Sequence, residues 1–299
     1  MKNVPELSII IPNYNSFMFL DDCLNSILNQ TFTNYEIIIC DDCSTDNSVK
    51  LIQQYALKYS FIRTIYHTKN IGISMNRNSG LLLARGLYFT TIDQDDIYMD
   101  IQKLEKEMDI VKYYKEKENK IVCAFSKIAI LDKDLNYLSD QWPESKIVEG
   151  YIFNEIITRS VMIPRDYIVA REAYLAVGQY DKLVKLYEDW DLKIRLAHKY
   201  DFYFTGIYGT GYRRHGQGFS NVSIPQNIRA LKKVFNKNIH LVLVSYKQEV
   251  EIKFASFLNK MKERIIKNLK QEYKDTKNHK RTFLARLKIK AKIIYWKHQ

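Results

Sequence analysis

The first hundred residues alternate between short apolar runs and segments whose apolar residues recur at helical spacing, and this alternation restricts the fold more than any other feature. Apolar runs bounded by turn residues are typical of buried strands. They occur at Leu7–Ile11 and Glu36–Cys40, and we expect further strands at Ile62–Tyr66 and Leu87–Ile92. Helical segments are expected at Phe19–Leu28, Val49–Tyr55, Ser74–Ala84 and Ile101–Tyr114. Strands that are apolar on both faces and alternate with helices predict an α/β fold with a mostly parallel sheet flanked by helices.

Two acidic clusters follow strands of this predicted sheet. Asp41 and Asp42 come at the end of the second strand, and Asp93–Asp96 come at the end of the fourth. Ligands of such sheets bind beyond the carboxyl ends of the strands. We therefore expect both clusters to meet on one edge of the sheet.

The charge divides the chain into two parts. The net charge is +12, and Arg229–Gln299 alone holds 20 Lys and Arg against 5 Asp and Glu. Amphipathic basic stretches occur at Ile252–Leu269 and Phe283–Trp296. We expect a domain over residues 1–228 and a basic helical extension over residues 229–299. Such asymmetry indicates an anionic partner for the extension.

The cysteines and the N-terminal residues indicate the cellular compartment of the protein. Four scattered cysteines are too few for a disulfide framework, and Cys40 and Cys43 form a C-x-x-C spacing without a second pair. No apolar core follows Met1, and no run approaches the roughly 18 apolar residues that span a bilayer. These features predict a cytoplasmic protein. The basic extension leaves open a peripheral position on the inner face of the cytoplasmic membrane.

Asp93, Gln94 and Asp95 form a candidate metal site. Clustered carboxylates repel one another unless a cation binds, and Mg²⁺ uses one or two carboxylates together with substrate phosphates. The alternative is a solvated turn in which Asp96 caps a helix. Asp42 could accept an N–H group of a nucleobase, or it could serve as an Asx-turn residue.

Three further motifs carry candidate chemistry. Arg77 could reach a phosphate or a base, or lie at the start of a surface helix. A carboxylate of Glu188-Asp189-Trp190-Asp191 could deprotonate an acceptor hydroxyl, although acids are also common in the first turn of a helix. His215, beside Arg213 and Arg214, suits diphosphate or metal binding, and the alternative is a structural or exposed histidine.

Taken in order, these motifs resemble the family 2 glycosyltransferases of the GT-A fold. The likeness runs from about Leu7 to Ser220. It rests on Ser8–Asn15, Ser26–Phe32, Glu36–Ser44, Asn70–Gly80, Asp93–Asp96, Gly178–Asp181, Glu188–Leu192 and Tyr212–His215. Asn76 departs from the usual alanine of the fourth segment.

The resemblance implies an inverting, metal-dependent transfer of a sugar from a nucleotide-sugar, a UDP-sugar above all, to an acceptor hydroxyl of a bacterial surface glycan or lipid-linked oligosaccharide. A divalent cation, Mn²⁺ or Mg²⁺, would be the cofactor. The resemblance also assigns roles to residues: Asp189 would be the catalytic base, and Asp95 and His215 would bind the metal. Glu188 and Trp190 would lie on the acceptor side. The nucleotide-sugar residues would be Pro12, Tyr14, Asn15, Asp42, Arg77, Asp93 and Gln94.

Other hypotheses remain at this point. A nucleotidyltransferase also uses a nucleotide and a metal, but Pro12-Asn13-Tyr14-Asn15 stands where its glycine-rich loop is expected. An anionic-surface or nucleic-acid binder would explain the basic extension but not the acidic edge, and we expect no nucleic-acid partner. An inactive relative and an oligomer both stay open. The sequence does not specify the donor sugar, the nucleobase or the acceptor.

Overall fold

The computed structural model describes residues 4–141, 147–216, 223–278 and 283–297. The chain forms two compact units, of which the first extends to Leu241 and the second consists of the residues from Val242 onward together with Thr158–Ser160. The boundary expected after residue 228 falls inside helix α8 (Ile224–Asn238). That helix belongs to the first unit, and its Asn238 donates a hydrogen bond to the carboxylate of Asp191 at 2.8 Å.

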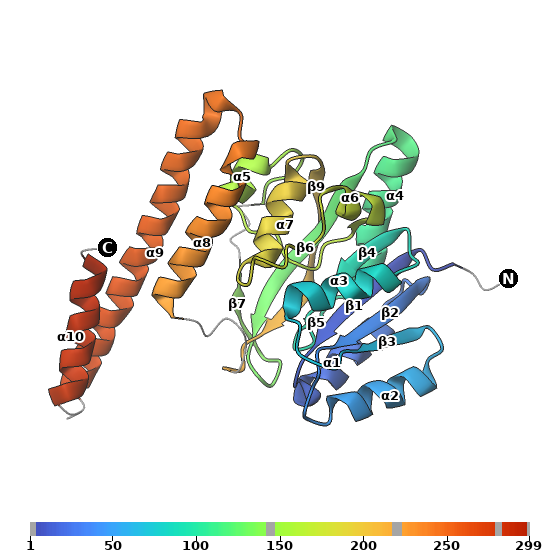
Figure 1. The fold of residues 1–299 in the computed structure, drawn as a ribbon, viewed down its shortest axis with the longest axis horizontal. Helices are drawn as coiled ribbons and strands as arrows, with labels where there is room; N and C mark the ends of the chain where they lie inside the picture. Colours follow the sequence, from blue (N-terminus) through green and yellow to red (C-terminus); the bar gives the residue numbers. More distant parts are fainter. Residues whose placement is uncertain (1–3, 142–146, 217–222, 279–282, 298–299) are drawn as a thin grey trace. The chain divides into compact units, whose positions relative to one another are not determined.

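A five-stranded sheet forms the centre of the first unit (Figure 1). Its strand order is β3-β2-β1-β4-β8, in which the first four strands are parallel and β8 is antiparallel to β4. The strands are β1 (Leu7–Asn13), β2 (Tyr35–Asp41), β3 (Ile62–Tyr66), β4 (Tyr88–Thr91) and β8 (Val169–Ala170). The four strands predicted in the first hundred residues are therefore the four parallel strands of this sheet.

Helices cover both faces of the sheet because β1 and β2 are buried on both sides. Ile9 and Ile11 of β1 share one core cluster with α1 (Phe17–Leu28), α2 (Ser48–Lys58) and α4 (Lys103–Glu118). The intervening Ile10 points to the opposite face, where it lies beneath Gly80 of α3 (Ile73–Leu83). Alternation of side chains along a strand thus divides the core into two layers.

A second, four-stranded sheet has the order β5-β9-β6-β7, and its strand pairing has no counterpart in the sequence patterns. Its strands are β5 (Ile97–Tyr98), β6 (Val122–Leu131), β7 (Tyr137–Asp140) and β9 (Asp201–Arg213). Strands β6 and β9 run parallel, and the end of β9 brings Arg213 to the acidic cluster that follows β4.

Short helices connect the two sheets. They are α5 (Phe153–Ile157), α6 (Arg171–Ala176) and α7 (Glu188–Ala197). The second unit contains α9 (Val244–Asn278) and α10 (Phe283–Lys297), which pack against each other. Among the described residues, no helix has the length and apolar character required to cross a membrane.

Gly80 gives a test of how closely α3 packs on the sheet. In an exposed helix, alanine is favoured over glycine by about 1 kcal/mol. Here a Cβ atom would lie 2.7 Å from Cγ2 of Ile10 and 2.8 Å from Sγ of Cys40. Overpacking of this kind costs about 1–3 kcal/mol, so we expect Gly80→Ala to lower the midpoint of urea unfolding followed by circular dichroism. Leu82→Ala, on the exposed side of α3, should change the stability by less than about 0.5 kcal/mol. A higher midpoint for Gly80→Ala would mean that the helix can move away from the sheet.

Candidate active site

An acidic cluster follows β4 at the carboxyl end of the parallel sheet. Asp93, Asp95 and Asp96 each offer a carboxylate oxygen, and these oxygens lie within 4.8 Å of one another. Asp96 is buried, whereas Asp93 and Asp95 remain partly exposed. Three carboxylates this close repel one another, and arginines pair with Asp93 and Asp96, whereas Asp95 contacts a histidine.

Arg77 of α3 connects this cluster to helix α7. Its guanidinium is 1% exposed, and it forms ion pairs with Asp93 at 2.6 Å and with Glu188 at 2.7 Å. The ring of Tyr180 lies 5.1 Å from the guanidinium carbon. Two motifs that are about a hundred residues apart in the chain are therefore held together by one buried cation.

Arg165 is a second cation at the cluster, and sequence reasoning missed it. Its guanidinium pairs with Asp93 and with Asp96, the latter at 3.0 Å, and it stacks 4.4 Å from the ring of Tyr212. Burial raises the pKa of Asp93, but the charges of Arg165 and Arg77 outweigh this and hold the pKa below its usual range. Asp93 is therefore an ionised carboxylate whose two oxygens are both engaged by arginines.

Asp95 has a different partner. Its Oδ2 lies 2.9 Å from Nε2 of His215, whose ring packs against Phe19 with 4.3 Å between the centroids. The Nδ1 atom of His215 is buried and has no hydrogen-bond partner among the described residues. Arg213, two residues before His215, pairs with Asp22 at 2.8 Å. Residues 217–222, which follow Gly216, lie outside the described part of the chain.

The two aspartates of α7 have different environments. Asp189 has 29% of its side chain exposed and forms an ion pair with Lys193 at 2.9 Å. Asp191 is fully buried, and its carboxylate accepts hydrogen bonds from Arg195, Lys237 and Asn238. Only Asp189 is therefore accessible to a substrate, and Asp191 holds α7 to α8 within the interior.

Residues around the ends of β1 and β2 form the neighbouring part of the edge. The two oxygens of Asp42 accept backbone N–H groups of Ile71 at 2.7 Å and Gly72 at 2.9 Å. The Asx-type turn proposed as its alternative role is made instead by Asp41, which accepts the N–H group of Ser44 at 2.9 Å. Asp42 thus fixes the loop that precedes α3.

Pro12, Tyr14, Asn15 and Gln94 also lie along this part of the edge. Pro12 is buried in β1, whereas Tyr14 just beyond the strand is 47% exposed. Asn15 accepts the N–H group of Thr45 at 2.7 Å through its side chain, and Gln94 donates to the hydroxyl of Ser16 at 3.1 Å. Tyr14 and Asn15 are the exposed members of this set, and Tyr14 is its aromatic member.

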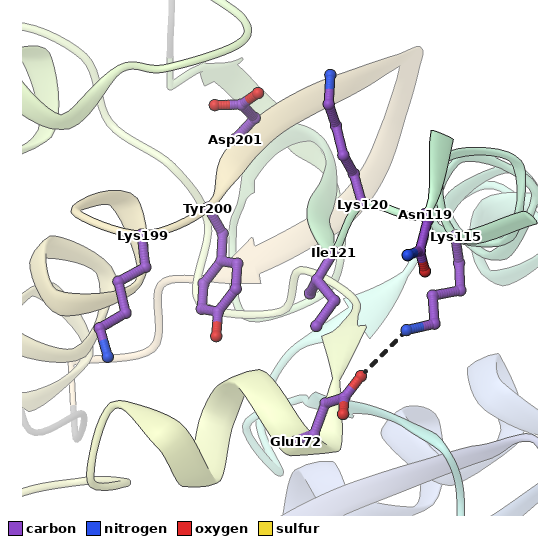
Figure 2. Close-up of a pocket in the computed structure, with 8 residues that line it drawn as sticks. All are labelled: Lys115, Asn119, Lys120, Ile121, Glu172, Lys199, Tyr200 and Asp201. Atoms are coloured by element: carbon purple, nitrogen blue, oxygen red, sulfur yellow. Dashed lines mark hydrogen bonds and ion pairs between the residues drawn. The ribbon is translucent and has the colours of Figure 1, made fainter. Parts of the chain in front are cut away.

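A hollow of about 480 Å³ lies elsewhere in the first unit (Figure 2). Its lining includes Lys115, Lys120, Glu172, Lys199 and Asp201, and Lys115 pairs with Glu172 at 3.4 Å. Asp201 begins β9, whereas the end of the same strand reaches the acidic cluster, so the hollow is at the opposite end of the sheet. Its mixed charges do not indicate a particular ligand.

Comparison with known proteins identifies the chain. The family model described as glycosyl transferase family 2 matches residues 8–174, which is more than half of the sequence. The chain belongs to glycosyl transferase family 2. The resemblance seen in the sequence motifs is therefore confirmed, and the nucleotidyltransferase alternative loses its support.

Curated relatives of this family 2 member include enzymes of bacterial glycan synthesis. The chain is 29% identical over 201 residues to chondroitin synthase of Escherichia coli, a match that covers 66% of this chain and 27% of the relative. It is 32% identical over 165 residues to the putative teichuronic acid biosynthesis glycosyltransferase TuaG of Bacillus subtilis, covering 54% and 63% respectively. The matches thus span about a quarter of the first relative and under two thirds of the second.

Solved structures support the fold. The crystal structure of S. aureus TarS 1-349 in complex with UDP-GlcNAc superposes with a TM-score of 0.65 at 20% identity, covering 85% of this chain and 72% of that one. The GT-A type of α/β fold expected from the sequence, with helices at its C-terminal end, is therefore confirmed.

The structure places the remaining predicted site residue of this glycosyltransferase in the interior. Trp190 is 3% exposed, and its indole N–H donates to the carbonyl of Ile156 at 2.7 Å. Its ring therefore packs α7 against α5 rather than lining open space. Arg165 and Lys193, which the motifs did not single out, contact the acids directly. Lys193 could have been found from its position one helical turn after Asp189, whereas Arg165 has no such local signal.

Asp191 provides a test of the difference between the partly exposed Asp189 and the buried Asp191 of α7. Breaking a buried ion pair by removing one partner's charge is typically destabilising by about 3–5 kcal/mol. We expect Asp191→Asn to lower the thermal unfolding temperature strongly, because Arg195 and Lys237 lose their common carboxylate. Asp189→Asn, at the partly exposed neighbour, should change it much less. Equal unfolding temperatures for the two variants would contradict the structural role of Asp191.

Proposed function

We propose that this protein is an inverting glycosyltransferase that transfers a sugar from a nucleotide diphosphate sugar, a UDP-sugar in the first instance, to a hydroxyl of a bacterial surface glycan or a lipid-linked oligosaccharide. One observation carries the proposal: Arg77 joins Asp93 of the acidic cluster to Glu188 beside Asp189. A site for the diphosphate and a base for the acceptor therefore lie on one edge of the sheet. Relatives named for chondroitin and teichuronic acid synthesis, and the UDP-GlcNAc complex of TarS, support this substrate class.

Asp189 is the proposed base. In a single displacement, the acceptor oxygen forms a bond to the anomeric carbon as the bond from that carbon to the diphosphate oxygen breaks. The bonding electrons leave with the diphosphate, and the proton of the acceptor hydroxyl passes to Asp189. The partial exposure of Asp189 allows contact with an acceptor, and Glu188 lies beside it as an acceptor-side residue. One carboxylate suffices, because inversion forms no covalent enzyme intermediate.

The chemistry of the acidic cluster fits a divalent cation. Arg77 and Arg165 occupy both oxygens of Asp93, and Arg165 and the N–H group of Arg213 occupy those of Asp96. Asp95 and His215 remain as a carboxylate and an imidazole whose buried Nδ1 has no partner among the described residues, and this donor set suits Mn²⁺ or Mg²⁺. Bound there, the cation would neutralise charge on the departing diphosphate.

The nucleoside is proposed to bind near the ends of β1 and β2. Tyr14 would stack against or border the base, with Pro12, Asn15 and Gln94 shaping the loops around it. Asp42 would use a shared oxygen for the base, since backbone N–H groups already bind its carboxylate. Arg77 and Asp93 would border the ribose and phosphates.

The function and its metal can be tested together. We expect purified protein to release UDP from a UDP-sugar when incubated with UDP-GlcNAc, UDP-Glc or UDP-Gal and Mn²⁺, measured by a coupled nucleotide assay. EDTA should abolish release, and Mn²⁺ or Mg²⁺ should restore it. Asp95→Asn should lower turnover by about 10²-fold or more, because electrostatic stabilisation of the leaving group is lost.

Asp134→Asn is the matched control, since this exposed aspartate pairs only with a neighbouring lysine at the surface. It should turn over the donor as the unchanged protein does. Full activity in EDTA would contradict the metal, and no release from GDP-, dTDP- or UDP-sugars would contradict the transfer reaction and favour an inactive relative.

A second proposal concerns location: the protein works in the cytoplasm, bound peripherally to the inner face of the cytoplasmic membrane through its basic helices. The support is the charge of residues 229–299 together with the surface of α10. Lys288, Lys290 and Lys292 are exposed there beside Ile294, which is 51% exposed, and Tyr295, which is 44% exposed. Apolar residues flanked by lysines are typical of helices that lie in a membrane interface.

Binding to vesicles tests the membrane proposal. Each lysine near an anionic leaflet contributes about 1 kcal/mol, so neutralising three should weaken binding roughly 100-fold. We expect the full chain to sediment with phosphatidylglycerol vesicles at low salt and to dissociate at high salt. The triple variant Lys288→Gln, Lys290→Gln, Lys292→Gln should lose most of this binding.

The control removes the same charge elsewhere. Lys115→Gln, Lys120→Gln, Lys199→Gln neutralises three exposed lysines around the hollow of the first unit and should bind vesicles almost unchanged. Equal loss in both triple variants would mean that net charge alone, and not the surface of α10, governs the association.

A further inference from the structure

The buried side chain of Lys193 contacts one carboxylate oxygen of Asp189, the partly exposed aspartate of α7. Its side chain is only 8% exposed, and Nζ lies 2.9 Å from Oδ2 of Asp189. The same ammonium donates to the carbonyl of Ile163 at 2.7 Å. The position of Oδ2 is therefore fixed relative to both the helix and the segment that precedes β8.

The neighbouring ion pair on the same helix has a different role. Asp191 and Arg195 have the same spacing as Asp189 and Lys193, but Asp191 is fully buried and Arg195 also donates to carbonyls of Val177 and Gln179. That pair joins the helix to the interior. The pair of Asp189 and Lys193 lies on the side that carries the accessible carboxylate, and Oδ1 of Asp189 accepts no hydrogen bond from the described residues.

We propose that Lys193 is a positioning residue for the transfer reaction: it holds Oδ2 of Asp189 in place and leaves Oδ1 to accept the proton of the acceptor hydroxyl. The inference rests on the proposed function, in which Asp189 is the base. A neutral or shorter side chain at this position would leave the carboxylate free to rotate. Misplacement of a reacting group by about 1 Å can lower a rate by about 10²-fold.

The charges around Asp189 support this arrangement. Burial raises the pKa of Asp189, but the charge and hydrogen bond of Lys193, followed by the charges of Arg165 and Arg77, lower it below its usual range. The acidic and phenolic groups that interact with Asp189 are Glu188 on the same helix and Asp93, Tyr167 and Tyr180 from other segments. Lys193 makes the largest contribution that lowers the pKa of Asp189, so its removal should raise that pKa.

The direction of the pH effect follows from this. Asp189 accepts a proton only when it is ionised, so activity is lost as the pH falls through its pKa. Because Lys193 lowers that pKa, the acidic limb of the pH–rate profile should lie at lower pH in the unchanged protein than in Lys193→Gln. A residue with a purely structural role would not move this limb.

A double-mutant cycle tests the proposal in the full chain, with UDP release from UDP-GlcNAc and Mn²⁺ as the probe. We expect Lys193→Gln to lower kcat about 10- to 100-fold with little change in the KM for the donor. The acidic limb should move to higher pH, and Lys193→Arg should recover part of the rate. In the Asp189→Asn background, Lys193→Gln should cause little further loss, because both changes remove the same function. Independent, multiplicative losses would overturn the proposal.

A measurement that does not need turnover separates this inference from the proposed function. In protein labelled with ¹³C at aspartate carboxyls, the Asp189 signal, assigned by its absence in Asp189→Asn, should titrate at higher pH in Lys193→Gln than in the unchanged protein. Lys199→Gln, an exposed lysine just beyond the same helix, should leave both the titration and kcat unchanged. An unshifted Asp189 signal in Lys193→Gln would overturn the positioning role, whereas absence of UDP release from the unchanged protein would contradict the proposed function alone.

Discussion

The buried guanidinium of Arg77 is the interaction on which the rest of the site depends. It is almost completely removed from water and lies between Asp93, Glu188 and the ring of Tyr180. Burying such a cation is costly unless its hydrogen bonds and charge are matched. The two carboxylates therefore have to be present together, and this requirement holds the loop after β4, the helix α3 and the start of α7 in one arrangement.

The acids around Arg77 differ in their partners, and the partners determine what each can do. Asp93 is held between two arginines, Asp95 lies against His215, and Asp189 lies against Lys193. Asp191, two residues along the helix, is enclosed by cations and an amide and joins α7 to α8. Four carboxylates of the same chemical type thus serve in phosphate-side positioning, metal binding, proton transfer and packing, according to the proposals above.

The first sheet could be predicted from the sequence, and the second could not. Strands β1 and β2 are short apolar runs between turn residues, so their burial on both faces is visible locally. Strand β9 carries Gly206, Gly209 and Gly211 among tyrosines, a pattern without clear alternation. Its place beside β6 depends on pairing across more than seventy residues, with irregularities in register, and no local pattern contains that information.

The sequence by itself determined the family, the parallel sheet and the end of the sheet at which the acids gather. The alternation of strands and helices along the chain, and the acids that follow each strand, are visible in neighbouring residues. Tertiary structure decided which acid meets which cation. Arg165 reaches the cluster from a segment with no motif of its own, Trp190 turns into the interior, and the first unit extends through α8 beyond the charge boundary. These outcomes depend on which elements pack together, since a side chain's partner and its exposure are set by residues distant in the chain.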